Sequence, residues 1–350
     1  MCSSDLGELG KKLRKNIKEN TDSGDLYEQH GFILNGHRCP FLCEDGLCEL
    51  IIKLGQDSLC EVCKNTPRNY LEYGKVREIS VSASCPEAAR LIYASDEKMR
   101  FTSRQTKEDF PFEEDDEEIA LSEFIREARD RGIEILQDRD HDIKTRMGIF
   151  LSYAGLVQQM INENNYKNKN ITIEKIENKY NFNDDTIESD DLYEAFLLRL
   201  RTYSGLASIG EAWRTSVRDI YQIFAEGKNE EECPVFYKSA CADFDGYMAS
   251  EGRMYEYEHH LVYYAFLLLS RCVDDMDFYT KARLVVLGLL FNRDMDMAIY
   301  LKKRSFEKSD RETNARIYAR EVEHSEENLT DLYEEILFEK ALLDIFTKKM

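Results

Sequence analysis

From residue 119 to its end the chain contains a single proline, Pro234, and its apolar residues recur with the period of an α-helix. Helices with one apolar stripe must bury that stripe against each other, at about 25 cal/mol per Å² of apolar area. The pattern therefore predicts a mainly α protein in which residues 119–350 form a multi-helix domain. The residues on one helical face are Ile119, Leu121, Phe124, Ile125 and Ala128 early in this region, and Leu329, Leu332, Tyr333, Ile336 and Leu337 near its end.

The segment KEDFPFEEDDEE, residues 107–118, contains a proline and a run of consecutive acids. Like charges packed so closely keep a segment solvated, so we expect an acidic linker there. It would join a cysteine-rich module, residues 7–106, to the helical domain, residues 119–350. Within the module, a leucine or isoleucine every four residues predicts an amphipathic helix from residue 7 to about residue 30, and an alternating pattern predicts a short strand within 73–84.

The net charge of -21 argues against binding to nucleic acids or anionic membranes, because both depend on Lys and Arg pairing with phosphates. A composition with 43% hydrophobic and 33% charged residues is typical of a globular protein. The longest apolar runs, 261–269 and 284–291, are far shorter than the ~20 residues of a membrane span. The chain does not open with a basic and apolar leader, so we expect a cytoplasmic protein.

Cysteines cluster in the N-terminal module with the spacing C-x3-C-x4-C-x11-C-x2-C-x21-C, from Cys39 to Cys85. In the cytoplasm, closely spaced cysteines indicate metal ligands or redox centres more often than disulfides. The C-x2-C pair presents two thiolates from one tight turn, which suits either Zn²⁺ or an iron–sulfur cluster. The scattered cysteines of the helical domain are expected to be ordinary buried residues; they are Cys233, Cys241 and Cys272.

Three motifs, in order, carry a specific resemblance. They are CPFLCEDGLCELIIKLGQDSLCEVCKNTPR (39–68), SCPEAARLI (84–92) and YAREVEHSEENL (318–329). Together they resemble the flagellin lysine N-methylase family. The resemblance implies a protein-lysine N-methyltransferase that acts on flagellin with S-adenosylmethionine and holds a [4Fe–4S] cluster. It assigns Cys39, Cys48, Cys63 and Cys85 as metal ligands and makes Cys43 and Cys60 auxiliary.

Members of that family normally open with a further cysteine group, roughly C-x4-C-x3-C-C, which this sequence lacks. The first six residues, MCSSDL, correspond to a common sequencing adapter translated from a GTG start. We therefore expect that the sequence is truncated at its N-terminus, that some ligands are missing with the lost residues, and that Cys2 has no function.

The third motif places five polar residues at i, i+3, i+4, i+7 and i+8, which is one face of a helix. Such a face is either solvated, with side-chain pairs worth about 0.2–0.5 kcal/mol each, or part of a site. The resemblance favours a site, in which Glu323 and His324 are catalytic and Arg320 and Asn328 bind the cofactor. Arg68, directly after Pro67, is a further candidate for holding the cofactor.

Lysine methylation needs a neutral amine, and a nearby carboxylate or a desolvated site favours loss of the ammonium proton. The sequence contains no Gly-rich loop after a strand, so a Rossmann-type methyltransferase domain is not predicted. The alternative function is a non-enzymatic zinc or iron–sulfur module that mediates protein interactions.

Overall fold

The computed structural model describes residues 7–19, 30–36, 38–106, 116–166, 188–208, 210–227, 229 and 231–338. The chain divides into two compact units, Met1–Thr66 and Pro67–Met350. Most of the predicted acidic linker lies outside the described residues, so the domain boundary at 107–118 stays a prediction.

The first unit is small and has a core of four apolar residues, Leu9, Phe41, Leu50 and Leu59. Its elements are α1 (Gly7–Asn16), β1 (Ile17–Glu19), β2 (His30–Phe32), α2 (Glu49–Leu54), the 3₁₀-helix η2 (Gln56–Ser58) and α3 (Glu61–Asn65). The helix predicted from residue 7 to about residue 30 is wrong in its length, because α1 ends at Asn16. Ile17 continues the apolar spacing but lies outside the helix, since it is 39% exposed and pairs with Phe32 in an antiparallel ladder.

The second unit opens with a β-hairpin made of β3 (Arg68–Tyr73) and β4 (Val76–Val81). The predicted strand within 73–84 is confirmed as β4, whereas the sequence analysis did not identify its partner β3. Glu78 of β4 accepts a 2.5 Å hydrogen bond from the Tyr73 hydroxyl and forms an ion pair with Arg129 of the first long helix. These contacts hold the hairpin against the helical domain. Helix α4 (Pro86–Ile92) follows the hairpin, with Cys85 as its N-cap.

The rest of the second unit is helical, which confirms the mainly α prediction. Its helices are α5 (Asp116–Leu136), α6 (Ile143–Asn162), α8 (Ser189–Ser204), α9 (Glu211–Phe224), α10 (Glu232–Ser250), α11 (Tyr255–Leu269), α12 (Cys272–Asp275), α13 (Phe278–Lys303), α14 (Lys308–Val322) and α15 (Glu326–Phe338). Their core includes the single tryptophan, Trp213, and the three scattered cysteines are buried, as expected. Across the described part of the chain, none of the helices combines the length and apolar character that crossing a bilayer requires.

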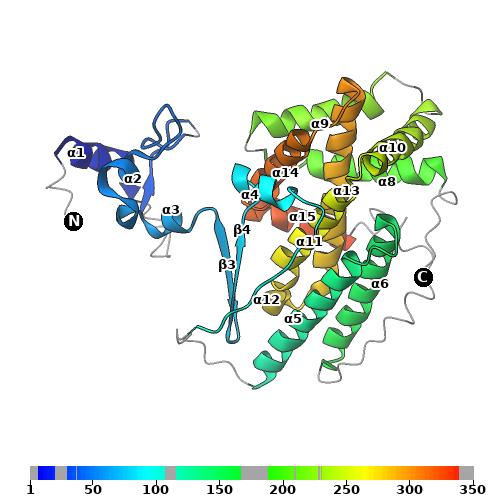
Figure 1. Ribbon diagram of the computed structural model, residues 1–350, viewed down its shortest axis with the longest axis horizontal. Coiled ribbons are helices and arrows are strands. Elements are labelled where there is room, and N and C mark those ends of the chain that lie inside the picture. The colour runs from blue at the N-terminus through cyan, green and yellow to red at the C-terminus, as the bar shows by residue number, and fades with distance from the viewer. Residues whose placement is uncertain are drawn as a thin grey trace. The chain divides into compact units, whose positions relative to one another are not determined.

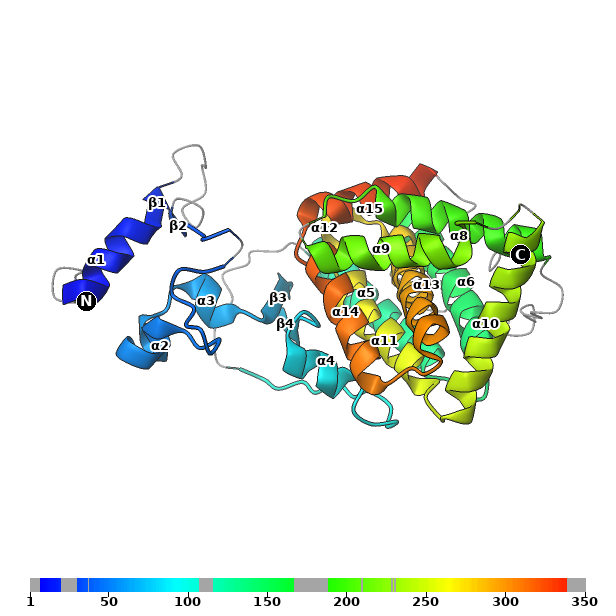
Figure 2. The same ribbon diagram turned by 90° about the horizontal axis from the view of Figure 1, so that it is seen from above.

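Helix α13 runs through the middle of the bundle, with α6, α9, α11, α14 and α15 packed around it (Figures 1 and 2). Almost every residue from Phe278 to Ala298 is buried. Gly288 allows Tyr318 of α14 to pack directly on the α13 backbone, since a Cβ atom there would lie only 2.6 Å from the Tyr318 oxygen. A small residue at this point therefore sets how closely α14 approaches α13.

Charged residues on α13 are buried in ion pairs. Asp294 lies 2.7 Å from Arg199 of α8, and Asp296 lies 2.6 Å from Arg311 of α14. Burial of a charge is tolerated only when a partner compensates it. These pairs explain how a helix that is covered on all sides retains the polar sequence NRDMD.

Candidate active site

Two of the sequence motifs meet in the second unit, although 240 residues separate them along the chain. One is the loop at residues 82–85, which follows β4 and leads into α4. The Ser82 amide donates a 2.8 Å hydrogen bond to the Pro67 carbonyl, so the end of the hairpin fixes the start of this loop. The other motif is the turn at residues 323–325, which joins α14 to α15.

The polar residues of the third motif do not lie on one helix, and the prediction of a single helical face is wrong. Helix α14 ends at Val322 with Glu323 as its C-cap, and α15 begins at Glu326. The break turns Glu323 and His324 toward the loop at 82–85, while Asn328 points into the protein. The motif is therefore a helix–turn–helix junction.

The carboxylate of Glu323 is surrounded by hydroxyl groups. Ser82 Oγ donates to its Oε2 atom at 2.8 Å, and the Tyr264 hydroxyl donates to Oε1 at 2.8 Å. The Tyr263 hydroxyl lies 3.2 Å from both oxygens. Burial raises the pKa of Glu323, and the hydroxyl donors only partly oppose that shift. A half-buried glutamate that holds a proton to higher pH than usual is suited to proton exchange with a substrate.

Tyr263 and Tyr264 come from α11, and the sequence analysis did not single them out. Tyr263 also accepts a 2.9 Å hydrogen bond from the Ala83 amide and lies 3.2 Å from the Val81 carbonyl oxygen. Its one hydroxyl hydrogen can thus go either to Val81 or to Glu323. Within an apolar run these tyrosines resemble core residues, and only tertiary structure brings both to one carboxylate.

His324 approaches the same loop from the other side of Ser82. Its Nε2 atom lies 2.9 Å from Ser82 Oγ and 2.9 Å from Ser84 Oγ. The residue as a whole is exposed, but partial desolvation of the ring lowers the pKa of His324, so the imidazole is neutral at pH 7. His324 is therefore the solvent-facing member of a group that includes the enclosed carboxylate.

The three predicted cofactor-binding residues differ in their surroundings. Arg68 opens β3 and pairs with Val81 in the ladder, which places it at the hairpin end that leads to Ser82. Arg320 is exposed on the last turn of α14. Asn328 is fully buried, and its amide binds the Ala207 amide (2.9 Å), the Ala207 carbonyl (2.9 Å) and the Glu321 carbonyl (2.7 Å). Those bonds give Asn328 the role of tying the α8–α9 connection to the end of α14.

A family model described as the FliB lysine N-methylase C-terminal domain matches residues 129–345, more than half of the chain. The chain belongs to the FliB lysine N-methylase family. The matched residues include α11 and the α14–α15 junction, hence both tyrosines and the Glu323–His324 pair. No curated protein and no solved structure gave a match to the chain.

In this FliB family member, four thiols of the first unit lie near one another. Cys60 and Cys63 share a side-chain hydrogen bond, and burial together with the nearby Cys60, Cys39 and Cys48 raises the pKa of Cys63 to about 11. Cys48 and Cys60 are the N-caps of α2 and α3, and neither side chain bonds to its helix. The donor set therefore suits a thiophilic metal or cluster in the kind and number of its ligands.

These thiols do not enclose a metal-sized space. Among the described residues, no three Cys, His, Asp or Glu side chains are arranged to hold a metal ion. Electrostatic effects such as those on the pKa of Cys63 act over longer distances than metal–ligand bonds. The raised pKa and the lack of a metal-binding arrangement are therefore compatible: the thiols lie near one another, but not close enough to coordinate one ion. Cys85, the fourth predicted ligand, belongs to the second unit, where it is the last residue of the loop that contacts His324. The metal-binding module thus stays a prediction.

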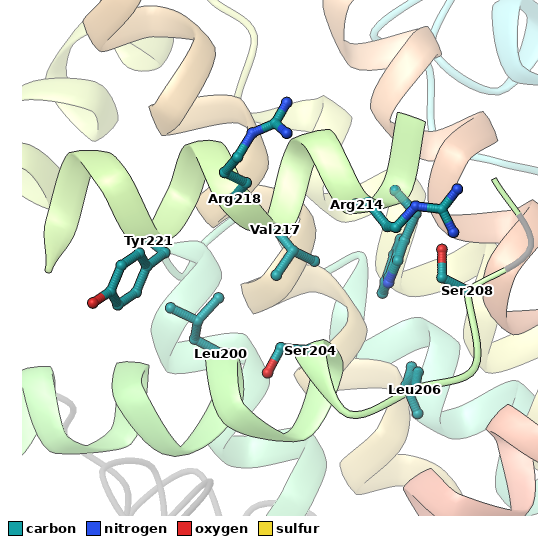
Figure 3. Close-up of a pocket in the computed structure, with 9 residues that line it drawn as sticks. Leu200, Ser204, Leu206, Ser208, Arg214, Val217, Arg218 and Tyr221 are labelled. Carbon is teal, nitrogen blue, oxygen red and sulfur yellow. The ribbon is translucent and has the colours of Figure 1, made fainter. Parts of the chain in front are cut away.

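A separate pocket of about 400 Å³ lies between α8 and α9 (Figure 3). Leu200 of α8 and Val217 of α9 point toward each other across it, and Arg214 extends toward Ser208 in the connecting loop. None of the predicted site residues lines this pocket. Its connecting loop is, however, the one that Asn328 ties to the α14–α15 junction.

Proposed function

We propose that this chain is a protein-lysine N-methyltransferase that acts on flagellin and uses S-adenosylmethionine. Membership of the FliB lysine N-methylase family supports the reaction class. The observation that carries the proposal is the Glu323 carboxylate, which lies among three hydroxyl groups where two distant motifs meet. The proposal places the protein in the cytoplasm, with flagellin as its substrate.

The reaction begins with a substrate lysine, whose ammonium has a reference pKa of about 10.4 and no lone pair. Glu323 is assigned as the base that takes one proton from the ammonium. The freed nitrogen lone pair then forms a bond to the methyl carbon as the carbon–sulfur bond breaks, which leaves a methylated ammonium and a neutral thioether. S-adenosylmethionine supplies the electrophilic methyl group. Glu323 and the hydroxyls around it hold the amine in place and keep water from the carboxylate.

Arg68 and Arg320 are the proposed partners of the carboxylate of S-adenosylmethionine. Both arginines are close to site residues. Arg68 pairs in the β-ladder with Val81, the residue before Ser82, and Arg320 stands one helical turn before Glu323. Guanidinium groups bind carboxylates through paired hydrogen bonds. Asn328 is left out of this set, because buried backbone groups already occupy its amide.

For the [4Fe–4S] cluster we propose a ligand set from one unit: Cys39, Cys48, Cys60 and Cys63. Beyond the effect of burial, Cys39, Cys48 and Cys60 all raise the pKa of Cys63, which supports this set. We therefore assign Cys60 as a ligand and no longer as an auxiliary residue. Four thiolates on four irons leave no iron open, so the cluster would stabilise a small unit whose own apolar core is slight. It takes no part in the proton and methyl transfers described above.

The activity test uses protein purified without oxygen, S-adenosylmethionine and flagellin, with methyl-lysine measured by mass spectrometry. Glu323→Gln is expected to lower turnover at least ~100-fold, since a general base typically contributes that much. Glu327→Gln is the matched control, because it makes the same chemical change at an exposed residue of the same motif. Wild-type protein that binds iron but forms no methyl-lysine would support the interaction-module alternative.

The ligand test compares Cys60→Ser with Cys85→Ser by iron and sulfide content. We expect Cys60→Ser to lose most of the iron and Cys85→Ser to keep it. Loss of iron in Cys85→Ser alone would restore the ligand set first predicted from the sequence. Stoichiometric zinc in place of iron and sulfide would contradict the cluster altogether.

A further inference from the structure

We propose that Ser82 is a proton-relay residue that connects the Glu323 carboxylate to His324 and, through His324, to solvent. The inference rests on the proposed function, because it assigns the route by which the lysine proton leaves the site. Ser82 was not among the residues predicted from the sequence.

The geometry that supports the relay is a short chain of hydrogen-bonding atoms. Ser82 Oγ is 2.8 Å from Glu323 Oε2 and 2.9 Å from His324 Nε2. The Ser82 side chain is fully buried, whereas His324 is exposed. Ser84 also lies 2.9 Å from His324, but it has no contact with Glu323 among the bonds of the described residues. Ser82 is thus the hydroxyl that touches both groups.

The relay works because a serine hydroxyl has one hydrogen and can also accept one. When Glu323 is ionised, Ser82 donates to the carboxylate and accepts from the Nε2–H group of a neutral His324. When Glu323 has taken the lysine proton, it donates to Ser82 Oγ, and His324 shifts by proton exchange with water to the Nδ1–H tautomer, whose Nε2 atom can accept a hydrogen bond. Ser82 then passes its own hydrogen to His324 Nε2 as it receives the hydrogen of Glu323. The resulting imidazolium releases its Nδ1 proton to water, and Glu323 is ionised again. One proton moves outward, and no electron is gained or lost.

The other groups that face Glu323 do not provide such a path. Tyr263 and Tyr264 reach it from α11, and burial keeps the pKa of each phenol well above its ordinary value. Both phenols therefore stay protonated and act only as donors to the carboxylate. The Tyr93 and Tyr318 phenols lie nearby, and each is fully buried as well. The route through Ser82 is the one that ends at an exposed titratable side chain.

The first test reads the tautomer of His324 by ¹⁵N NMR in the full-length protein and needs no methyl transfer. In wild type at neutral pH we expect the Nε2–H tautomer. In Glu323→Gln, the amide NH₂ replaces Oε2 and donates to Ser82, so Ser82 should donate to His324 and shift the imidazole to the Nδ1–H tautomer. Adding Ser82→Ala should abolish this dependence on residue 323, whereas Ser84→Ala should preserve it. The same tautomer in wild type and Glu323→Gln would overturn the relay.

The second test measures methyl transfer as a function of pH for Ser82→Ala and for the control Ser152→Ala, which removes the hydroxyl of another buried serine, on α6, that donates to the Gly148 carbonyl. We expect Ser82→Ala to lower turnover about 10- to 100-fold and to change the pH profile, while Ser152→Ala stays within about threefold of wild type. A tautomer switch in a protein that does not methylate flagellin would keep the relay and reject the function. Methylation that is unaffected by Ser82→Ala would keep the function and reject the relay.

Discussion

At the scale of single residues, Glu323 combines burial with a full set of hydroxyl partners. Burial raises the pKa of its carboxyl, while Ser82, Tyr264 and Tyr263 partly offset the cost of the charge. A structural carboxylate would be better served by a cation at hydrogen-bonding distance, as Glu258 is by Arg146, and the arginine partners of Glu258 lower its pKa despite its burial. Hydroxyl partners leave the proton affinity of Glu323 high, which is the property that a base for an amine requires.

The raised pKa of Glu323 predicts how stability changes with pH. The folded chain binds this proton more tightly than the unfolded chain, whose reference pKa is about 4.3. The contribution of Glu323 to the free energy of unfolding is therefore fully present below about pH 4 and is lost as the pH rises through the folded-state pKa. Each unit of pKa difference corresponds to about 1.4 kcal/mol.

Urea unfolding of wild type and Glu323→Gln between pH 4 and pH 8 checks this prediction. The neutral amide cannot ionise, so the stability of wild type relative to the variant should fall as the pH rises. Other titrating groups cancel in the difference between the two proteins. Curves that run parallel over the whole range would show that the carboxyl has an unshifted pKa.

The sequence pointed to Glu323 and His324 as site candidates, but it did not point to the residues that contact them. Both residues belong to a motif with a characteristic order of charged residues, and this order can be recognised from the sequence alone. Ser82, Tyr263 and Tyr264 are common residue types in unremarkable local contexts, and their role depends on contacts across 59 or more positions. Asn328 was placed in the site because a continuous helix was assumed across a turn.

At the scale of elements, α13 contacts most of the other helices of the bundle, and at Gly288 it makes room for Tyr318 of α14. A methyl group there would lie 2.6 Å from Tyr318 Oη and 3.2 Å from Tyr318 Cζ. Tyr318 is buried and its hydroxyl is 3.1 Å from that of Tyr203, so the ring has no free space to move into. Helix α14 carries Glu323 at its C-terminal end, which makes this contact relevant to the site.

Gly288→Ala is therefore expected to destabilise the protein by about 1–3 kcal/mol through overpacking. Thermal unfolding of Gly288→Ala, Tyr318→Phe and the double variant measures the effect. Tyr318→Phe removes the clashing oxygen, so the double variant should be more stable than the sum of the two single changes predicts. Additive effects would mean that the alanine is accommodated without contacting Tyr318.

Helices were easier to predict than the hairpin. A helix shows its buried face through neighbours three and four positions apart, and residues 119–136 and 329–337 showed it clearly. Strand β3 was missed because its six residues, RNYLEY, alternate too briefly to stand out. The first helix was predicted too long because Ile17 continued the apolar spacing of Leu9 and Leu13, although its main chain pairs with β2.

At the scale of the whole molecule, the chain consists of two compact units of very different size. Among the described residues, the large apolar core of the second unit is built from residues from Ala83 onward. Helix α4 packs on α14 and α11, so the segment that follows Pro67 is part of the helical unit. Composition marks the acidic run at 107–118 as solvated, but it gives no sign of these long-range contacts.

A chain that begins at Pro67 is accordingly expected to fold. Its helical circular dichroism signal should remain, and its melting temperature should lie within about 4 °C of that of the full chain, a shift equivalent to roughly 1 kcal/mol. It should contain no iron, because the four proposed cluster ligands lie before its first residue. A shortened chain without cooperative unfolding would show that the second unit depends on the first.

The fully buried amide of Asn328 has a consequence for how this protein can vary. One side chain fixes both the α8–α9 connection, at Ala207, and the end of α14, at Glu321. An insertion or deletion in residues 205–208 would pull on the same amide that holds the turn carrying Glu323 and His324. Chain length is therefore restricted in a surface loop that itself contributes none of the reacting groups.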